Sequence, residues 1–352
     1  MRILLVRLRL IGDVVFTTPL IRALRRRYPD AQLAYVVEPA AAPVVQGNPH
    51  LTEIIVAPRR EGFGRLRDDL ALARELRARK FDLAIDLHGG PRSAWLTWAS
   101  GAPSRIGYAI KGRSWMYTHV VPCAADLAPR HSVVNQWDLL GPLGIEPCDP
   151  ERDAVEMNED PRAVDRVRER LGKAGVPSDA PVIVMHVSAG NPFRRWPEQA
   201  FCDVIVSLAQ ADPNRRIILT AGPSDLDVVR RLVETARSRL RTPESVPTVE
   251  DWDLQELRAL VTRAAVYIGG DSGPLHVAST TATPIVELLG PTLPERSRPW
   301  RTPRARAEIV DVGSLPCRPC NQRHCVPGDF RCLTGITPDR VIAAAERMLK
   351  EI

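Results

Sequence analysis

Short apolar runs, rich in branched residues, alternate along the chain with longer amphipathic or charged segments. In the first half, such runs predict strands at 2–8, 31–38, 53–58 and 81–89. Segment 17–32 is apolar on one face and basic on the other, and it predicts a helix, as does the charged segment 64–80. Strands that alternate with helices indicate a parallel sheet covered on both faces.

The same pattern starts again after a passage rich in proline and acidic residues at 139–161, which predicts a linker. Further strands are predicted at 181–188, 215–222, 266–271 and 284–290, and further helices at 197–210, 224–240, 253–265 and 274–282. The last segment begins with a threonine and a proline, which predicts a closing helix. We therefore expect two Rossmann-like α/β domains, at 1–155 and 156–336, followed by that helix at 337–352.

Length and composition agree with two soluble domains. The chain has 352 residues, of which 44% are hydrophobic and 26% charged. No apolar run approaches the ~18 residues of a membrane span, and the N-terminus lacks a small-residue cleavage site, so we expect a cytoplasmic protein. The net charge of +6 indicates an anionic partner. Aromatic residues make up only 5% of the chain and form no basic-aromatic platform, which argues against nucleic acid and a non-catalytic binding role.

The loops that follow strands in the second half carry candidate chemistry, because open α/β sheets bind ligands at the carboxyl ends of their strands. Two such domains would face each other across a cleft. The first loop combines Ser188 and other small residues with Arg194 and Arg195. Small residues let backbone amides approach a phosphate, and arginine can pair with it in a bidentate manner. A surface loop with solvated arginines is the alternative.

A sharper signal is the loop GGDSGPLH at 269–276. Asp271 and Ser272 are typical cap residues and Gly273 permits close approach, so the loop predicts an anion site at a helix start, with a well-capped helix as the alternative. His276 could donate a hydrogen bond to a phosphate or pack in the core. Asp225, which follows the strand predicted at 215–222, could lie near the ribose of a nucleotide or cap a helix.

Two acidic residues outside this loop could also have a chemical role. We expect Asp253 to cap a helix rather than to bind a metal. Asp13 follows Gly12 in the turn after the first strand. It could cap the next helix, or act as a general base that takes a proton from an attacking hydroxyl. No dinucleotide-binding glycine motif follows the first strand, and no P-loop motif occurs in the sequence. These observations argue against nicotinamide enzymes and P-loop ATPases.

Four of the seven cysteines lie close together near the C-terminal end, at Cys317, Cys320, Cys325 and Cys332. They could ligate a tetrahedral zinc ion. Their irregular spacing favours reduced structural thiols or a disulfide, and zinc remains the alternative.

Taken together, four segments closely resemble the heptosyltransferases of glycosyltransferase family 9: 11–24 (IGDVVFTTPLIRAL), 86–108 (DLHGGPRSAWLTWASGAPSRIGY), 193–201 (FRRWPEQAF) and 269–292 (GGDSGPLHVASTTATPIVELLGPT). The resemblance implies a GT-B fold whose N-terminal domain binds the acceptor and whose C-terminal domain binds a nucleotide sugar. It further implies metal-independent, inverting transfer with no required cofactor. The implied donor is ADP-heptose, and the implied acceptor is an anionic, lipid-linked saccharide of the lipopolysaccharide inner core.

In that scheme Asp13 is similar to the family's general base. Arg194 stands where the family commonly has lysine, and the resemblance implies that it stabilises the departing diphosphate. The implied donor-binding residues are Ser188, Arg194, Arg195, Asp225, Asp271, Ser272, Gly273 and His276. The implied acceptor-binding residues are Arg7, Arg9, Arg59, Arg60, Arg92, Lys111 and Arg113, whose excess of positive charge fits peripheral contact with the inner membrane. A transferase of the same fold that uses another nucleotide sugar, or a capsule, exopolysaccharide or protein acceptor, is the alternative.

Overall fold

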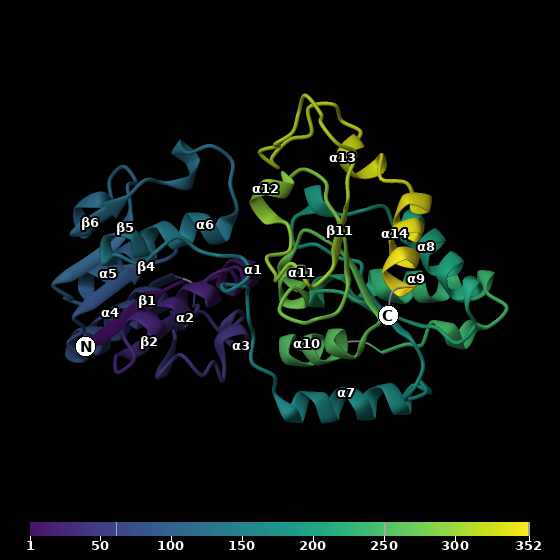
Figure 1. Cartoon of the computed structure of the whole chain (residues 1–352), viewed down its shortest axis with the longest axis horizontal. Helices are drawn as coiled ribbons and strands as arrows, with labels where there is room; N and C mark the ends of the chain where they lie inside the picture. The colour runs from purple at the N-terminus through teal and green to yellow at the C-terminus, as the bar shows by residue number, and fades with distance from the viewer. Residues whose placement is uncertain (61, 250, 351–352) are drawn as a thin grey trace. The chain divides into compact units, whose positions relative to one another are not determined.

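The computed structural model describes residues 1–60, 62–249 and 251–350; the end of the segment predicted as a closing helix, 351–352, lies outside these ranges. The chain divides into two compact units, Met1–Asn158 and a second that starts at Glu159 (Figure 1). Among the described residues, no helix combines the length and apolar character needed to cross a bilayer.

Within the described residues, the first unit holds a six-stranded sheet with the order β3-β2-β1-β4-β5-β6, and all its pairs are parallel. Its strands are β1 (Arg2–Val6), β2 (Gln32–Val37), β3 (Glu53–Val56), β4 (Leu83–Asp86), β5 (Ser104–Tyr108) and β6 (His119–Val121). Its helices are α1 (Ile11–Val15), α2 (Thr18–Arg27), α3 (Ala42–Val45), α4 (Gly62–Ala78), α5 (Pro91–Ala99) and α6 (Ser132–Trp137), with short 3-10 turns at Ser114–Met116, Ala124–Asp126 and Asp138–Leu143.

Alternation along β1 explains how this sheet is covered. Leu4 and Val6 point into one core, where Leu76 of α4 and Leu96 of α5 pack against them. Ile3 and Leu5 are equally buried, and they face the opposite side because successive strand residues alternate. A sheet buried on both faces accounts for the continuous apolar run in the sequence.

The described part of the second unit holds a five-stranded parallel sheet with the order β11-β10-β9-β7-β8. Its strands are β7 (Val182–His186), β8 (Arg216–Thr220), β9 (Val266–Gly270), β10 (Ile285–Leu288) and β11 (Ala307–Val310). Its helices are α7 (Pro161–Lys173), α8 (Glu198–Ala211), α9 (Leu226–Arg239), α10 (Leu254–Arg263), α11 (Gly273–Ala278), α12 (Pro294–Ser297), α13 (Arg331–Thr334) and α14 (Pro338–Lys350), with 3-10 turns at Pro192–Arg194, Pro223–Asp225 and Pro243–Ser245.

Two separate cores cover the two faces of the second sheet. One contains residues of α8, α9 and α14, among them Phe201, Leu232 and Val341. The other contains residues of α7 and α10, among them Val167 and Leu260. The predicted α/β class, with two parallel sheets, is therefore confirmed.

Candidate active site

Both sheets change direction at one point in their strand order, and the candidate residues gather there. In the first sheet the switch lies between β1 and β4, and in the second between β7 and β9. Open α/β sheets bind ligands at the carboxyl ends of the strands that flank such a switch. The loops after β7 and β9 contain Arg194 and Asp271, and the loops after β1 and β4 contain Arg9 and His88.

In the second unit, the guanidinium of Arg194 bridges two loops. Its Nη1 donates to the Asp271 carbonyl at 3.0 Å and lies 3.1 Å from the Asp271 carboxylate. Its Nε donates to Oε1 of Gln322 at 2.8 Å. The Arg194 side chain is 29% exposed whereas that of Asp271 is 2% exposed. Arg194 can therefore contact a ligand, while the buried Asp271 holds its guanidinium on the protein side.

His276 completes this cluster by contacting the carboxylate oxygen of Asp271 that Arg194 does not pair with. Its Nε2 lies 3.5 Å from Oδ1 of Asp271, and both side chains are buried. Burial alone would raise the pKa of Asp271, but His276 and Arg194 outweigh it, so the pKa lies below its ordinary value. Asp271 is thus an anion that orients two donors of hydrogen bonds.

The start of α11 differs from the capped helix that was the alternative. Ser272 occupies the N-cap position before Gly273, yet its side chain forms no capping bond. Its hydroxyl oxygen is buried and has no hydrogen-bond partner within the described structure. A Cβ on neighbouring Gly270 would come within 3.4 Å of the Arg194 carbonyl, so the loops approach closely.

Arg195 forms the neighbouring ion pair. Its Nη2 lies 3.2 Å from Oδ1 of Asp225, and its Nε donates to the Ala189 carbonyl at 2.9 Å. Asp225 precedes α9 at the N-cap position but makes no side-chain capping bond. Its carboxylate, which is 9% exposed, pairs with the arginine instead.

Ser188 links two loops from within the protein. Its hydroxyl accepts a hydrogen bond from the Gly222 amide at 2.9 Å and lies 3.3 Å from Nε2 of His186. The other ring nitrogen of His186 lies 3.0 Å from the Thr220 hydroxyl. Burial lowers the pKa of His186 to about 4, so the imidazole is neutral at pH 7.

Glu287 is a buried acid beside this cluster that the sequence did not single out. It lies on β10 opposite Gly269, is fully buried, and neither carboxyl oxygen has a hydrogen-bond partner among the described residues. Burial and the nearby Asp271 raise the pKa of Glu287 well above its usual range. The side chain is therefore expected to remain protonated.

In the first unit, Asp13 pairs with Arg7. Asp13 lies within the five-residue helix α1, which follows Leu10, a residue with a positive φ of 67°. Its carboxylate contacts the Arg7 guanidinium, whose Nη1 also donates to the Leu87 carbonyl at 2.5 Å. The Asp13 side chain is 28% exposed and that of Arg7 only 10%. Arg7 therefore fixes the Asp13 carboxylate, and part of the Asp13 side chain remains exposed.

A basic pocket of about 260 Å³ lies beside these residues in the first unit. Arg9, Arg59, Arg60 and Arg92 line it together with residues that the sequence did not indicate, namely Glu38, Arg65 and His88. The described residues that line it do not include Arg7, Lys111 or Arg113, so the predicted acceptor residues are only partly brought together.

Glu38 and His88 moderate the charge of this pocket. Glu38 accepts a hydrogen bond from Nη1 of Arg92 at 2.8 Å and lies 3.7 Å from Nε of Arg59. Burial, followed by the nearby Arg7 and Arg9, lowers the pKa of His88 to about 4. His88 lies at the end of the strand predicted at 81–89, within the DLHGG motif, and that position was the signal that could have identified it.

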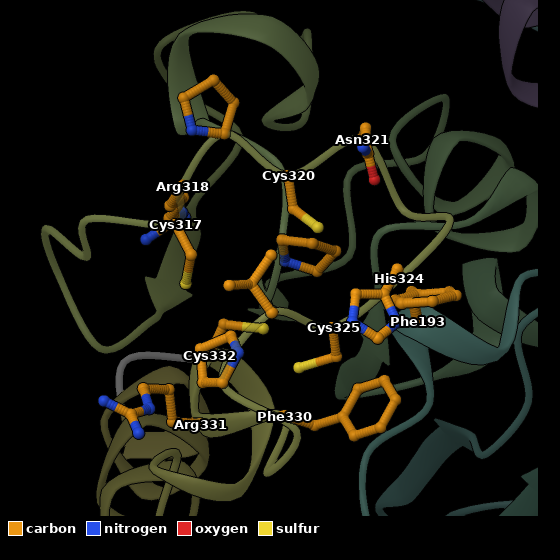
Figure 2. Close-up of a pocket in the computed structure, with 14 residues that line it drawn as sticks. Phe193, Cys317, Arg318, Cys320, Asn321, His324, Cys325, Phe330, Arg331 and Cys332 are labelled. Carbon is orange, nitrogen blue, oxygen red and sulfur yellow. The ribbon is translucent and has the colours of Figure 1, made fainter.

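The clustered cysteines line a separate pocket of about 280 Å³ (Figure 2). All four are free thiols, and Phe193 and Phe330 contribute an aromatic wall. Burial and the neighbouring thiols raise the pKa of Cys332 above its usual range. In the described ranges, no group of three or more His, Cys, Asp and Glu side chains has an arrangement suited to a metal ion.

Asp253 forms the cap that its position predicts. Its side chain accepts from the Glu256 amide at 2.7 Å, and the Glu256 side chain reaches back to the Asp253 amide to complete a capping box. The capping interpretation is confirmed.

The fold defines an α/β protein with two parallel sheets, one in each unit. Candidate ligand-binding residues lie at the switch point of each sheet. Residues 70–330 match the model of glycosyltransferase family 9 (heptosyltransferase), so the chain belongs to this family and is a glycosyltransferase. The predicted family and the predicted class of enzyme, a glycosyltransferase, are both confirmed.

Individual relatives agree with the family match. Lipopolysaccharide heptosyltransferase 3 of Escherichia coli K12 is 28% identical over 97% of this chain and 96% of its own length. A crystal structure of a family 9 glycosyltransferase from Veillonella parvula is 25% identical, with a TM-score of 0.86 over 100% of this chain and 98% of that one. The E. coli heptosyltransferase WaaC, solved with ADP, shares the fold at 19% identity, with a TM-score of 0.73 over 99% of this chain and 100% of that one.

Proposed function

We propose that the protein transfers heptose from ADP-heptose to an anionic, lipid-linked acceptor of the lipopolysaccharide inner-core type. The observation that carries this proposal is the cluster of Arg194, Asp271 and His276 at the switch point of the second sheet. The heptosyltransferase relatives and the ADP bound by the similar WaaC structure support the choice of donor.

In the second unit, the donor's diphosphate would bind to the exposed part of Arg194, which Asp271 orients. Arg195, the Ser272 hydroxyl, Gly273 and His276 would complete the site. Positive charge and hydrogen-bond donors that are already fixed in place stabilise a departing diphosphate without reorganisation. These groups support transfer that requires neither a metal ion nor a cofactor.

In the first unit, Asp13 would act as the general base. Its carboxylate takes the proton of the acceptor hydroxyl while the hydroxyl oxygen bonds to the anomeric carbon and the carbon–phosphate oxygen bond breaks. Attack opposite the leaving group inverts the anomeric centre. Arg7 fixes the carboxylate for this role, and the basic pocket would hold the anionic groups of the acceptor.

Contact with the cytoplasmic face of the inner membrane would bring the lipid-linked acceptor to the enzyme. Trp98 and Trp115 pack edge to face, with ring centroids 5.8 Å apart, and both are exposed. Lys111 and Arg113 precede Trp115 in the same loop. Exposed tryptophans beside basic residues suit the interface of an anionic membrane.

A transfer assay tests the proposal. With a panel of ADP-, GDP- and UDP-sugars and a heptose-deficient core acceptor, we expect turnover with ADP-heptose, an inverted product by NMR, and rates that a chelator leaves unchanged. Asp13→Asn should lower kcat by roughly 10²- to 10⁴-fold because the base is lost. The control is Asp30→Asn, at an exposed position outside the site. Turnover only with another nucleotide sugar, or full activity of Asp13→Asn, would contradict the proposal.

A further inference from the structure

Gln322, on the segment that carries the clustered cysteines, contacts the loop that presents Arg194. Its Oε1 accepts a hydrogen bond from Nε of Arg194 at 2.8 Å and another from Nδ2 of Asn191 at 2.9 Å. An amide oxygen has two lone pairs, so both contacts can form at once. Segment 317–332 is thereby joined to the loop after β7, more than a hundred residues earlier in the chain.

These contacts hold the Arg194 guanidinium from two sides. Gln322 engages Nε, and Asp271 engages Nη1 through its carbonyl and its carboxylate. Neither contact uses Nη2, and the Arg194 side chain is 29% exposed, so a ligand can approach the guanidinium. An arginine that is already fixed loses less conformational freedom on binding, and the affinity rises accordingly.

Gln322 is itself fixed by the body of the second unit. Its backbone has a φ of 57°, a left-handed conformation that non-glycine residues seldom adopt. Its amide donates to Sγ of Cys320 at 3.3 Å, and the Cys320 amide donates to the Pro291 carbonyl at 3.2 Å, in the loop after β10. Phe330 packs on Phe193 beside Arg194, with ring centroids 5.4 Å apart.

Arg318 ties the same segment to the sheet. Its Nε and Nη2 donate to the Thr292 carbonyl at 2.9 and 2.6 Å, and its Nη1 donates to Asp311 at 2.7 Å. Thr292 follows β10 and Asp311 follows β11. The segment is therefore anchored on two strand ends, and Gln322 can act as a fixed support for the arginine.

We propose that Gln322 is a positioning residue that orients Arg194 toward the diphosphate of the donor. This rests on the proposed function, in which Arg194 binds that diphosphate. The chemistry of the side chain favours the role: beside the Asp271 carboxylate, a neutral amide fixes the guanidinium without adding a second negative charge, whereas a second carboxylate would compete with the diphosphate.

A double-mutant cycle tests the proposal. ADP affinity is measured by calorimetry for the wild type, Gln322→Ala, Arg194→Ala and the double variant. We expect Gln322→Ala to weaken ADP binding by about fivefold to tenfold, as the loss of one charge-assisted hydrogen bond would. Because Gln322 acts through Arg194, we expect no further weakening in the Arg194→Ala background.

Two additional variants make the outcome decisive. Gln322→Glu retains an acceptor for both donors and so guards against local unfolding; it should also weaken ADP binding while adenosine binding is unchanged. Gln199→Ala, which removes an exposed contact with Asp203 on α8, should have no effect. Equal losses in both backgrounds, or unchanged ADP affinity in both Gln322 variants, would overturn the positioning role. An Arg194→Ala variant that binds ADP normally would instead overturn the function proposed for Arg194, and this inference with it.

Discussion

Ser188 shows how a predicted ligand-binding residue can have a supporting role. Its hydroxyl accepts from the Gly222 amide and contacts His186, and the side chain is buried. Ser188→Ala would leave these groups unsatisfied, so we expect a loss of about 1–3 kcal/mol in the free energy of unfolding, measured in urea. Ser238→Ala, at an exposed position on α9, is the control. Unchanged stability with weaker ADP binding would make Ser188 a direct donor ligand.

Glu287 is expected to make stability depend on pH. Its pKa is raised in the folded state, so the native protein retains this proton more strongly than the unfolded chain. The associated stabilisation is complete below the ordinary pKa of 4.5 and is lost as the pH rises toward the folded value. Glu287→Gln removes this dependence, so the unfolding temperature of the variant should rise relative to that of the wild type as the pH increases above the ordinary pKa of 4.5.

Glu346 provides a control of opposite sign. Its hydrogen bond with Arg215 lowers its pKa, so its stabilisation is present above the ordinary pKa and is lost on acidification. Glu346→Gln should therefore be less stable than wild type near neutral pH, and the difference should shrink in acid. An unfolding temperature of Glu287→Gln that follows wild type at every pH would show that Glu287 is not held protonated.

At the scale of elements, the cysteine segment is expected to hold reduced thiols. The four sulfurs line one pocket as free cysteines, and the raised pKa of Cys332 favours its protonated form. Alkylation of the reduced, denatured protein should modify seven cysteines, and the same count without prior reduction would indicate that no disulfide formed. Zinc analysis should give much less than one ion per chain. One zinc per chain, lost in Cys325→Ser, would favour the metal alternative.

Hydrophobic periodicity predicted β1 to β4 in the first sheet and β7 to β10 in the second, but not β5, β6 or β11. The runs that correspond to β1 and β7 are buried on both faces, so their apolar pattern is continuous and easy to recognise. Strands β6 and β11 have exposed or half-buried positions, and β5 begins with two half-buried residues, so the apolar patterns of these three strands are weak.

Strand order could not be predicted from periodicity, because it depends on which strands pair across the sheet. That order brings Arg194 to Asp271, 77 positions apart, and Arg9 to His88. Local chemistry was predicted where it depends on neighbours in sequence, as in the Asp253 capping box. Contacts between distant segments, such as Gln322 with Arg194, leave no local signal.

At the scale of the whole molecule, the net charge of +6 and the exposed Trp98–Trp115 pair lead to a prediction about membranes. We expect the protein to sediment with vesicles that contain anionic lipid and to detach as salt is raised, because the attraction is screened. Trp115→Ala should bind such vesicles more weakly, whereas Trp252→Ala, a contact of Arg170 in the second unit, should not. Equal binding to neutral and anionic vesicles would contradict this account.

In the proposed function, the loops of the second unit bind an ADP-sugar through Arg194. The most direct measurement is calorimetric titration of the wild type and Arg194→Ala with ADP, GDP and UDP. We expect the wild type to bind ADP in preference to GDP and UDP. We expect Arg194→Ala to bind ADP at least about tenfold more weakly, since a charged contact with the diphosphate is lost. Preference for GDP or UDP would contradict the assigned donor, and undiminished ADP binding by Arg194→Ala would contradict the assigned site.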